Sequence, residues 1–418
     1  MSRYLLSAII IILFTGCMHF NQNVQIGKKS FEQEDFYIMK ALEHQHMGEY
    51  DQAIETYNTL YEKSSKTNYL IEAAKISFLT NNNAKTSLLI QKALEVEPTN
   101  SDLLRIKIAL LMKENKVIEA SKDIEKLLQI EKNSRNLTIA GAIFFQLKSY
   151  ELSLKYFQSA YKESLDENVL LNMVDVLYSY LDRKDEAVAY LETHTRMQTC
   201  SRKACLKLVE IYGREQNIDG IISVYKRMYA RFNEDEFAKK VVELLLYKKD
   251  KQGAIDFLSS TSYDQRMLLD IYVSSSDFDN AYKIASQLYE DGQDINDLGR
   301  LAIYEYEKNK NKLNKKILNS VAKKFEKVVQ VLEEPLYLNY YGYLLIDHDI
   351  NIQKGIDLVQ RALKKEPNSI FYLDSLAWGL YKQRKCFEAK EILDRFIDTT
   401  QEEEVLMHYK KIKECLQQ

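Results

Sequence analysis

Small and apolar residues recur along the chain with a period of about 34 residues, from near Glu34 almost to the end. Each clear copy has a small residue, an aromatic or aliphatic residue on the next helical turn, and another apolar or small residue one turn further. The clearest copies are Ala53-Tyr57-Leu60, Ser153-Phe157-Ala160, Ala281-Ala285-Leu288 and Gly355-Val359-Ala362. Repeats of this length form helix pairs that bury their apolar faces only against neighbouring pairs. The pattern therefore predicts an all-α solenoid.

The same spacing predicts where the helix pairs begin and end. Two units, 134–167 and 335–369, follow the pattern closely, and the last 15 or so residues predict a terminal capping helix. The period fails over 295–334, an irregular helical connection in which we expect a longer helix pair joined by a Lys/Asn-rich turn; the segment is also a candidate hinge or boundary between two stacks of repeats. The predicted units are 34–67, 67–100, 101–134, 134–167, 168–201, 201–234, 235–261, 262–295, 296–334, 335–369 and 370–401.

The regular units resemble the tetratricopeptide repeat (TPR) family, in which small residues let the two helices of a pair cross closely and large ones fill the space between pairs. The most similar segment is 337–395, which contains LNYYGY at 338–343 and YLDSLAW at 372–378. These strings are similar to a paired TPR unit that is common at the C-terminus of bacterial envelope proteins. The resemblance implies a right-handed superhelix of about 10–11 helix pairs, with TPR-like repeats over 34–294 and a C-terminal pair with its capping helix over 335–418.

The resemblance also implies a partner-binding groove, because the first helix of each TPR unit lines the concave face. In the last two units the groove positions include an aromatic stripe with two polar groups, a composition typical of interface hot spots. The alternative is that Trp378 and Tyr343 pack beneath the capping helix, since aromatic residues at helical spacing are usually core. The candidate groove residues are Asn339, Tyr343, Asp374, Trp378 and Tyr381, flanked by Leu336, Ile346 and Phe371.

The N-terminus reads as an export signal. Arg3 precedes an apolar run from Tyr4 to Phe14, which is too short to span a bilayer. The run ends in Leu13-Phe14-Thr15-Gly16-Cys17, which resembles the lipobox of bacterial lipoproteins, although Phe14 departs from the usual aliphatic residue. The resemblance implies a lipoprotein signal peptide over 1–16, a lipidated Cys17 and a polar tether over 17–33. The alternative is an ordinary signal peptide with a coincidental cysteine.

Four cysteines remain after Cys17, and an even number in an oxidising compartment indicates disulfides. The repeat places Cys200 in a loop and Cys205 in the first turn of the next helix. It places Cys386 at the start of one helix and Cys415 at the end of the helix that follows. We therefore predict the pairs Cys200–Cys205 and Cys386–Cys415, with four unpaired thiols as the alternative; no cysteine or histidine stands at zinc-ligand spacing.

Composition and missing motifs argue against several classes of function, namely nucleic-acid binding and the common enzyme classes. The 418 residues include only 12 Gly and 3 Pro, carry a formal charge of −3, and hold no clustered basic stripe that would predict nucleic-acid binding. No phosphate-binding loop, dinucleotide fingerprint, G-x-S-x-G or H-E-x-x-H motif is present. We expect no enzyme activity, no cofactor and no metal.

These observations predict a non-enzymatic scaffold lipoprotein of a Gram-negative envelope, lipid-anchored and facing the periplasm. The residue after Cys17 is Met18 rather than the Asp that retains enterobacterial lipoproteins at the inner membrane, so the resemblance favours the outer membrane. The expected partners are proteins of an envelope machine, such as a flagellar motor, secretion system or outer-membrane assembly complex. The alternative is a peptidoglycan- or polysaccharide-associated factor that recruits or regulates cell-wall enzymes.

Overall fold

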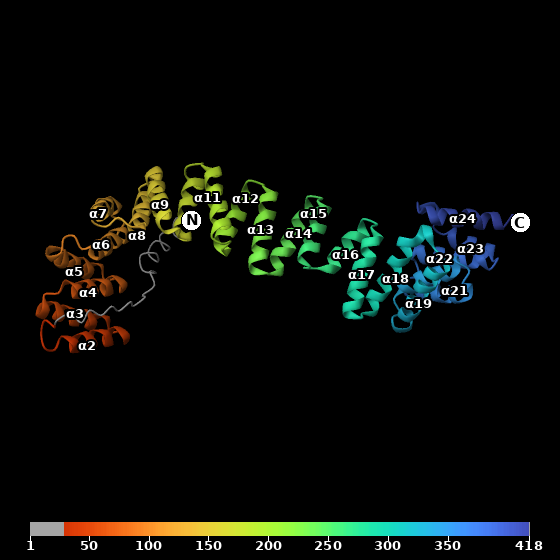
Figure 1. Ribbon diagram of the computed structural model, residues 1–418, viewed down its shortest axis with the longest axis horizontal. Coiled ribbons are helices and arrows are strands. Elements are labelled where there is room, and N and C mark those ends of the chain that lie inside the picture. The colour runs from red at the N-terminus through yellow and green to blue at the C-terminus, as the bar shows by residue number, and fades with distance from the viewer. Residues whose placement is uncertain (1–28, 418) are drawn as a thin grey trace. The chain divides into compact units, whose positions relative to one another are not determined.

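The computed structural model describes residues 29–417, which form α-helices joined by short turns and contain no β-strand (Figure 1). The predicted leader, Cys17 and the first part of the predicted tether lie outside the described residues. The described residues divide into two compact units, one that ends at Asn233 and one that begins at Glu234. No helix among the described residues is long and apolar enough to cross a membrane.

The described part of the first unit contains six helix pairs. Each pair consists of two successive helices that pack together, and within this unit successive pairs contact one another. The helices are α2 (Glu34–His46), α3 (Tyr50–Ser64), α4 (Thr67–Leu79), α5 (Asn83–Val96), α6 (Ser101–Lys113), α7 (Val117–Ile130), α8 (Ser134–Gln146), α9 (Tyr150–Ser164), α10 (Glu167–Ser179), α11 (Lys184–Met197), α12 (Arg202–Arg214) and α13 (Ile218–Phe232).

The second unit contains five helix pairs and a final helix, so the predicted all-α, TPR-like array of about 10–11 pairs with a C-terminal capping helix is confirmed for the described residues. Its helices are α14 (Asp235–Tyr247), α15 (Lys251–Thr261), α16 (Gln265–Ser274), α17 (Phe278–Gly292), α18 (Ile295–Asn309), η1 (Lys310–Lys312), α19 (Lys315–Val331), α20 (Pro335–Asp347), α21 (Ile352–Lys365), α22 (Ile370–Lys382), α23 (Cys386–Leu393), η2 (Ile397–Thr399) and α24 (Glu403–Cys415).

The turns within the helix pairs share one backbone conformation. In ten of the pairs the turn contains a residue with positive φ, which reverses the chain in a few residues, and only the first of these is glycine. The left-handed conformation costs a non-glycine residue roughly 1–2 kcal/mol, so the stacking of the pairs must outweigh it. The turn residues are Gly48, Asn81, Asn115, Lys148, Asp182, Gln216, Lys249, Ser276, Asp349 and Arg384.

Asparagine and aspartate side chains start many of the helices. Asn100 and Asp166, for example, each accept hydrogen bonds from the backbone N–H groups of two residues in the first turn of α6 and α10. Such caps satisfy donors that the helix leaves unpaired, and each stabilises the helix by about 1 kcal/mol. Part of the abundant asparagine of this chain therefore has a structural role.

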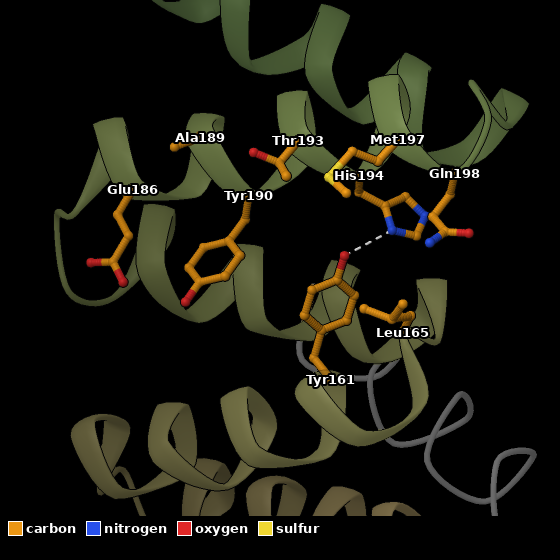
Figure 2. A pocket seen from close by; sticks show the side chains of 9 residues that line it. All are labelled: Tyr161, Leu165, Glu186, Ala189, Tyr190, Thr193, His194, Met197 and Gln198. Atoms are coloured by element: carbon orange, nitrogen blue, oxygen red, sulfur yellow. Dashed lines mark hydrogen bonds between the residues drawn. The ribbon is translucent and has the colours of Figure 1, made fainter.

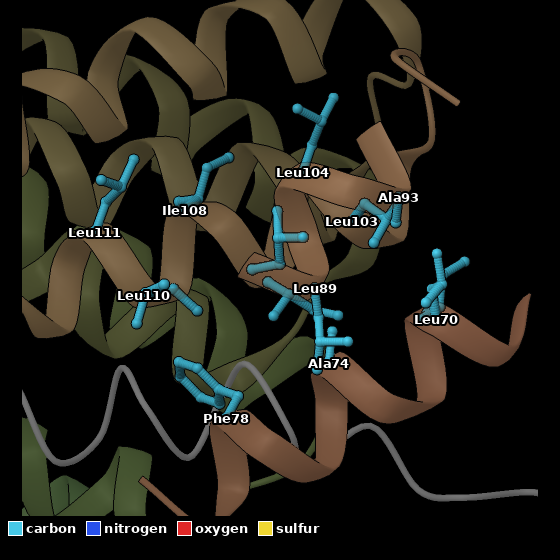
Figure 3. Packing of buried hydrophobic residues seen from close by; sticks show 14 of the residues in the cluster. Leu70, Ala74, Phe78, Leu89, Ala93, Leu103, Leu104, Ile108, Leu110 and Leu111 are labelled. Atoms are coloured by element: carbon cyan, nitrogen blue, oxygen red, sulfur yellow. The ribbon is translucent and has the colours of Figure 1, made fainter. Parts of the chain in front are cut away.

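A hydrophobic core runs between successive pairs from α2 to α8 of the first unit. Leucine, isoleucine and alanine side chains from α4, α5 and α6 interdigitate, with Ile108, Leu103 and Leu70 fully buried (Figure 3). Burying one such side chain stabilises the fold by about 1.5–3 kcal/mol. Because every pair takes part of its core from the next, each pair depends on its neighbours, as the period of the sequence indicates.

Glycine permits the closest helix crossing. A Cβ atom built on Gly342 of α20 would lie 2.8 Å from the backbone oxygen of Gly355 in α21, and one built on Gly355 would lie 2.7 Å from the oxygen of Gly342. The two helices therefore touch backbone to backbone at this point. A Cβ atom on Gly141 of α8 would similarly meet the ring of Phe157 in α9, at 2.6 Å.

The segment 295–334, where the sequence period fails, contains two helices joined by a short Lys/Asn-rich connection. It forms a helix pair, α18 and α19, that packs against α17 on one side and α20 on the other. The two helices have 15 and 17 residues, and a short 3-10 turn over the Lys/Asn-rich residues joins them. The longer helices shift the spacing of the small residues, so the sequence period fails although the array of helix pairs continues.

Candidate functional site

A cavity of about 480 Å³ opens in the C-terminal unit between the first helices of three successive pairs. Helices α18, α20 and α22 form its walls, η1 and the loop before α22 border it, and the start of α24 adds Glu404. Aromatic and acidic side chains dominate the lining. The lining residues are Tyr306, Glu307, Lys310, Leu336, Asn339, Tyr340, Tyr343, Glu366, Ser369, Phe371, Tyr372, Asp374, Ser375 and Glu404.

The structure brings together part of the predicted groove. Asn339, Tyr343 and Asp374 line the cavity, as do the flanking Leu336 and Phe371, which are 48% and 60% exposed. These five residues come from α20 and α22, at the positions where the repeat places groove residues. The acidic residues of α18 and α24, which complete the cavity, were missed because their approach depends on tertiary packing.

Trp378 lies in a different environment from the one the groove hypothesis gave it. Its ring is buried, stacks on His408 of α24 at 4.0 Å between ring centroids, and stacks on Tyr381 at 4.7 Å. The indole N–H donates to Asp347 Oδ1 at 3.0 Å. Of the two alternatives for Trp378, the structure has packing beneath the capping helix, and Tyr381 lies beside it outside the cavity lining.

Asp374 is held by the capping helix. His408, which is fully buried, has Nδ1 2.9 Å from one carboxylate oxygen of Asp374 and 3.1 Å from the other. Burial raises the pKa of Asp374, and the contact with His408 opposes the rise. The imidazole therefore fixes the orientation of this carboxylate at the edge of the cavity.

Glu307 is an acid of the cavity wall for which the structure records no side-chain hydrogen bond. Burial raises its pKa, as does the charge of Glu404, while Lys310 lowers it. Glu404 itself accepts the hydroxyl proton of Tyr343 and lies 3.9 Å from the Lys310 ammonium. The side-chain oxygen of Asn339 is buried without a hydrogen-bond partner. The cavity thus presents acceptors that lack donors.

A second cavity, of about 430 Å³, lies in the first unit between α9 and α11. Tyr161 reaches across it to His194, with 2.8 Å between its hydroxyl oxygen and Nδ1, while Glu186 lies at the opposite end (Figure 2). Glu186 is already paired with Arg183, and Tyr190 is in contact with Gln158. Because its polar groups largely satisfy one another, this cavity is the weaker candidate.

The structure joins both predicted cysteine pairs. Cys200 and Cys205 have Cα atoms 5.7 Å apart, and Cys386 and Cys415 have Cα atoms 6.1 Å apart. Both separations are those of ordinary disulfides. The second pair ties the end of α24 to the start of α23, so it holds the capping helix over Trp378.

Metal binding and a histidine–aspartate pair are two other features to consider in residues 29–417. These residues contain no group of three or more His, Cys, Asp or Glu side chains placed to hold a metal ion. The buried histidine–aspartate pair is covered by Trp378, and the histidine's other nitrogen has no hydrogen-bond partner.

No family model and no curated protein match this chain. Among solved structures, it is similar to PilF of Pseudomonas aeruginosa, with 18% identity, a TM-score of 0.40, and coverage of 53% of this chain and 100% of that one. It is similar to YrrB, described as a TPR protein with an unusual peptide-binding site, with 17% identity, a TM-score of 0.36, and coverage of 47% and 99%. It is also similar to yeast Tom70, with 13% identity, a TM-score of 0.34, and coverage of 92% and 96%. The assignment of an all-α, TPR-like fold rests on the helix pairs described above.

Proposed function

We propose that this protein is a non-enzymatic scaffold that holds partner proteins through the cavity of its C-terminal unit. The observation that carries the proposal is the cavity itself, which the first helices of three successive pairs build from five aromatic rings. Rigid aromatic side chains around a partly open pocket are the usual anchors of protein interfaces. Two of the apolar residues at the rim, Leu336 and Phe371, are exposed enough to touch a bound segment.

The proposal includes a place for the scaffold in the cell. The predicted signal peptide over 1–16 and the lipobox-like sequence before Cys17 support a lipid-anchored protein of a bacterial envelope, facing the periplasm and more specifically on the outer membrane. The partners would then be subunits of an envelope machine. A polar tether from the lipid to the first helix leaves the helix pairs free to reach such a complex.

Site-specific photocrosslinking in cells tests the scaffold function. A photoreactive residue placed at Phe371 should crosslink to a defined envelope protein, because this side chain lies at the cavity rim. The same probe at Tyr247, an exposed residue on α14 away from the cavity, serves as the control. Adding Leu336→Asp should abolish the Phe371 crosslink while the purified variant keeps its melting temperature. Identical crosslinks from both positions, or none from Phe371, would contradict the proposal.

A further inference from the structure

The C-terminal cavity has a charge that its own residues leave unbalanced. Four carboxylates line it, Glu307, Glu366, Asp374 and Glu404, against the single ammonium of Lys310. Lys310 is half-exposed, and its ammonium lies 3.9 Å from a carboxylate oxygen of Glu404. Because an acidic group in a partly buried site is costly without a counter-charge, this lining favours a bound cation.

The hydrogen-bonding groups of the cavity point to the same chemistry. Asn339 offers a buried side-chain oxygen without a hydrogen-bond partner, and the carboxylate of Glu307 lines the same cavity. Both groups accept hydrogen bonds, so a ligand that supplies N–H groups would satisfy them. The N–H groups of a guanidinium or ammonium would do this, whereas an anionic ligand would meet further acceptors.

Aromatic rings supply the third part of the site. The five rings of the lining belong to Tyr306, Tyr340, Tyr343, Phe371 and Tyr372. The hydroxyl group of Tyr343 donates to Glu404, which leaves its ring beside the acidic edge. A cation near such rings gains attraction from their negative faces in addition to its ion pairs.

We propose that the cavity binds a basic side chain, an arginine or lysine, that a partner polypeptide presents between apolar residues. The proposal rests on the scaffold function proposed above and specifies what the partner must carry. The cation enters between the aromatic rings and binds Glu307 and the Asn339 oxygen, while the apolar neighbours contact Leu336 and Phe371 at the rim. Arginine suits the site better than lysine, because its planar guanidinium carries several N–H groups and stacks on rings.

Calorimetric titration of the purified full chain with small probes tests this inference. Acetyl-Leu-Arg-Leu-amide should bind about tenfold more tightly than the same peptide with citrulline, which keeps the shape of arginine but has no charge. Binding should weaken as salt is raised, since the attraction is partly ionic. Equal affinity for the two peptides, or tighter binding of free spermidine than of the arginine peptide, would overturn the proposal.

Matched variants locate the site. Glu307→Gln and Asn339→Leu should each remove most of the preference for arginine over citrulline. Glu388→Gln makes the same change in net charge as Glu307→Gln but lies on α23 outside the cavity lining, so it should leave the preference intact. If Glu388→Gln matches Glu307→Gln, or if Glu307→Gln binds both peptides as the parent chain does, the assignment to this cavity is wrong. Melting temperatures show that each variant is folded.

The two proposals fail separately. A Phe371 crosslink that persists in Glu307→Gln would keep the scaffold function and reject the basic side chain as the recognised group. Arginine-selective binding by the purified chain, with no crosslinked partner in cells, would keep the pocket chemistry and reject the proposed function.

Discussion

Single partly buried carboxylates connect helices that belong to different pairs. Glu192 of α11 accepts hydrogen bonds from Arg227 of α13 at 2.5 and 3.0 Å, from Arg196 at 2.7 Å and from Tyr212 of α12 at 2.8 Å. Burial would raise the pKa of Glu192, but these donors outweigh it and lower the pKa from 4.5 to about 2. The ionised carboxylate of Glu192 therefore links three helices, α11, α12 and α13.

The pKa of Glu192 makes stability depend on pH. Because its pKa is lower in the folded state, the carboxylate stabilises the fold above about pH 4.5, and this contribution is lost as the pH falls from 4.5 towards 2. At pH 7, Glu192→Gln should lower the free energy of unfolding by about 3 kcal/mol. Urea unfolding from pH 7 to pH 3 should show the difference between parent and variant shrinking below pH 4.5.

Glu243→Gln is the control for this experiment. Glu243 pairs with Lys239 and Lys240 on the exposed face of α14, where water screens the charges. Its substitution should leave the unfolding curve nearly unchanged at every pH. A difference between parent and Glu192→Gln that stays constant down to pH 3 would show that the carboxylate charge is not the cause.

At the scale of helices, the crossing of α20 and α21 depends on the absence of two side chains. Gly342 and Gly355 face each other through backbone oxygens, and the cavity residues Asn339 and Tyr343 flank Gly342 on the same helix. The close crossing therefore sets the position of α20 against α21, and with it the position of the groove residues on α20. A shift of α20 would displace one whole wall of the cavity.

Gly342→Ala should destabilise the chain by about 1–3 kcal/mol, because the new methyl group overlaps the backbone of α21 and the helices must separate. Gly213→Ala is the matched control, since a Cβ atom on Gly213 of α12 meets nothing within 4 Å. It should stabilise the chain by about 0.5–1 kcal/mol through helix propensity. Chemical unfolding of both variants measures the contrast, and destabilisation of the same size in both would contradict close packing as the reason for Gly342.

At the scale of the whole molecule, the array divides into two compact units, and the proposed binding cavity belongs entirely to the second. The predicted lipid anchor stands at the opposite end of the sequence. Attachment and recognition are thus assigned to different parts of the chain. A variant that loses one should keep the other.

Cys17→Ser should release the protein from membranes, or leave it unprocessed, because lipidation requires the thiol. Fractionation of cells into membrane and soluble parts measures the release, and the size of the mature chain measures processing. Cys200→Ser, which alters a cysteine outside the leader, should stay with the membranes. A Cys17→Ser protein of unchanged mature size that remains membrane-bound would contradict the anchor.

The sequence by itself determined the class of fold. Small residues such as Ser153 and Gly355 recur with the period of a helix pair, and this spacing follows from local helix geometry and close packing. It also placed Cys386 and Cys415 at helix ends that meet. Over 295–334 the sequence period fails although the helix pairs continue, because longer helices change the spacing of the small residues.

Only the tertiary structure decided which groove residues are free to bind. Trp378 and Tyr343 have equivalent positions in successive units, yet α24 covers the first, while the second lines a cavity. The repeat pattern describes one pair and its neighbours, so it does not specify how the final helix folds back. The acids Glu307 and Glu404 are nearly 100 residues apart in sequence, and only the packing of the helices brings them to one cavity. The repeat pattern in the sequence describes spacing along one helix pair, so it does not specify which side chains of distant helices meet.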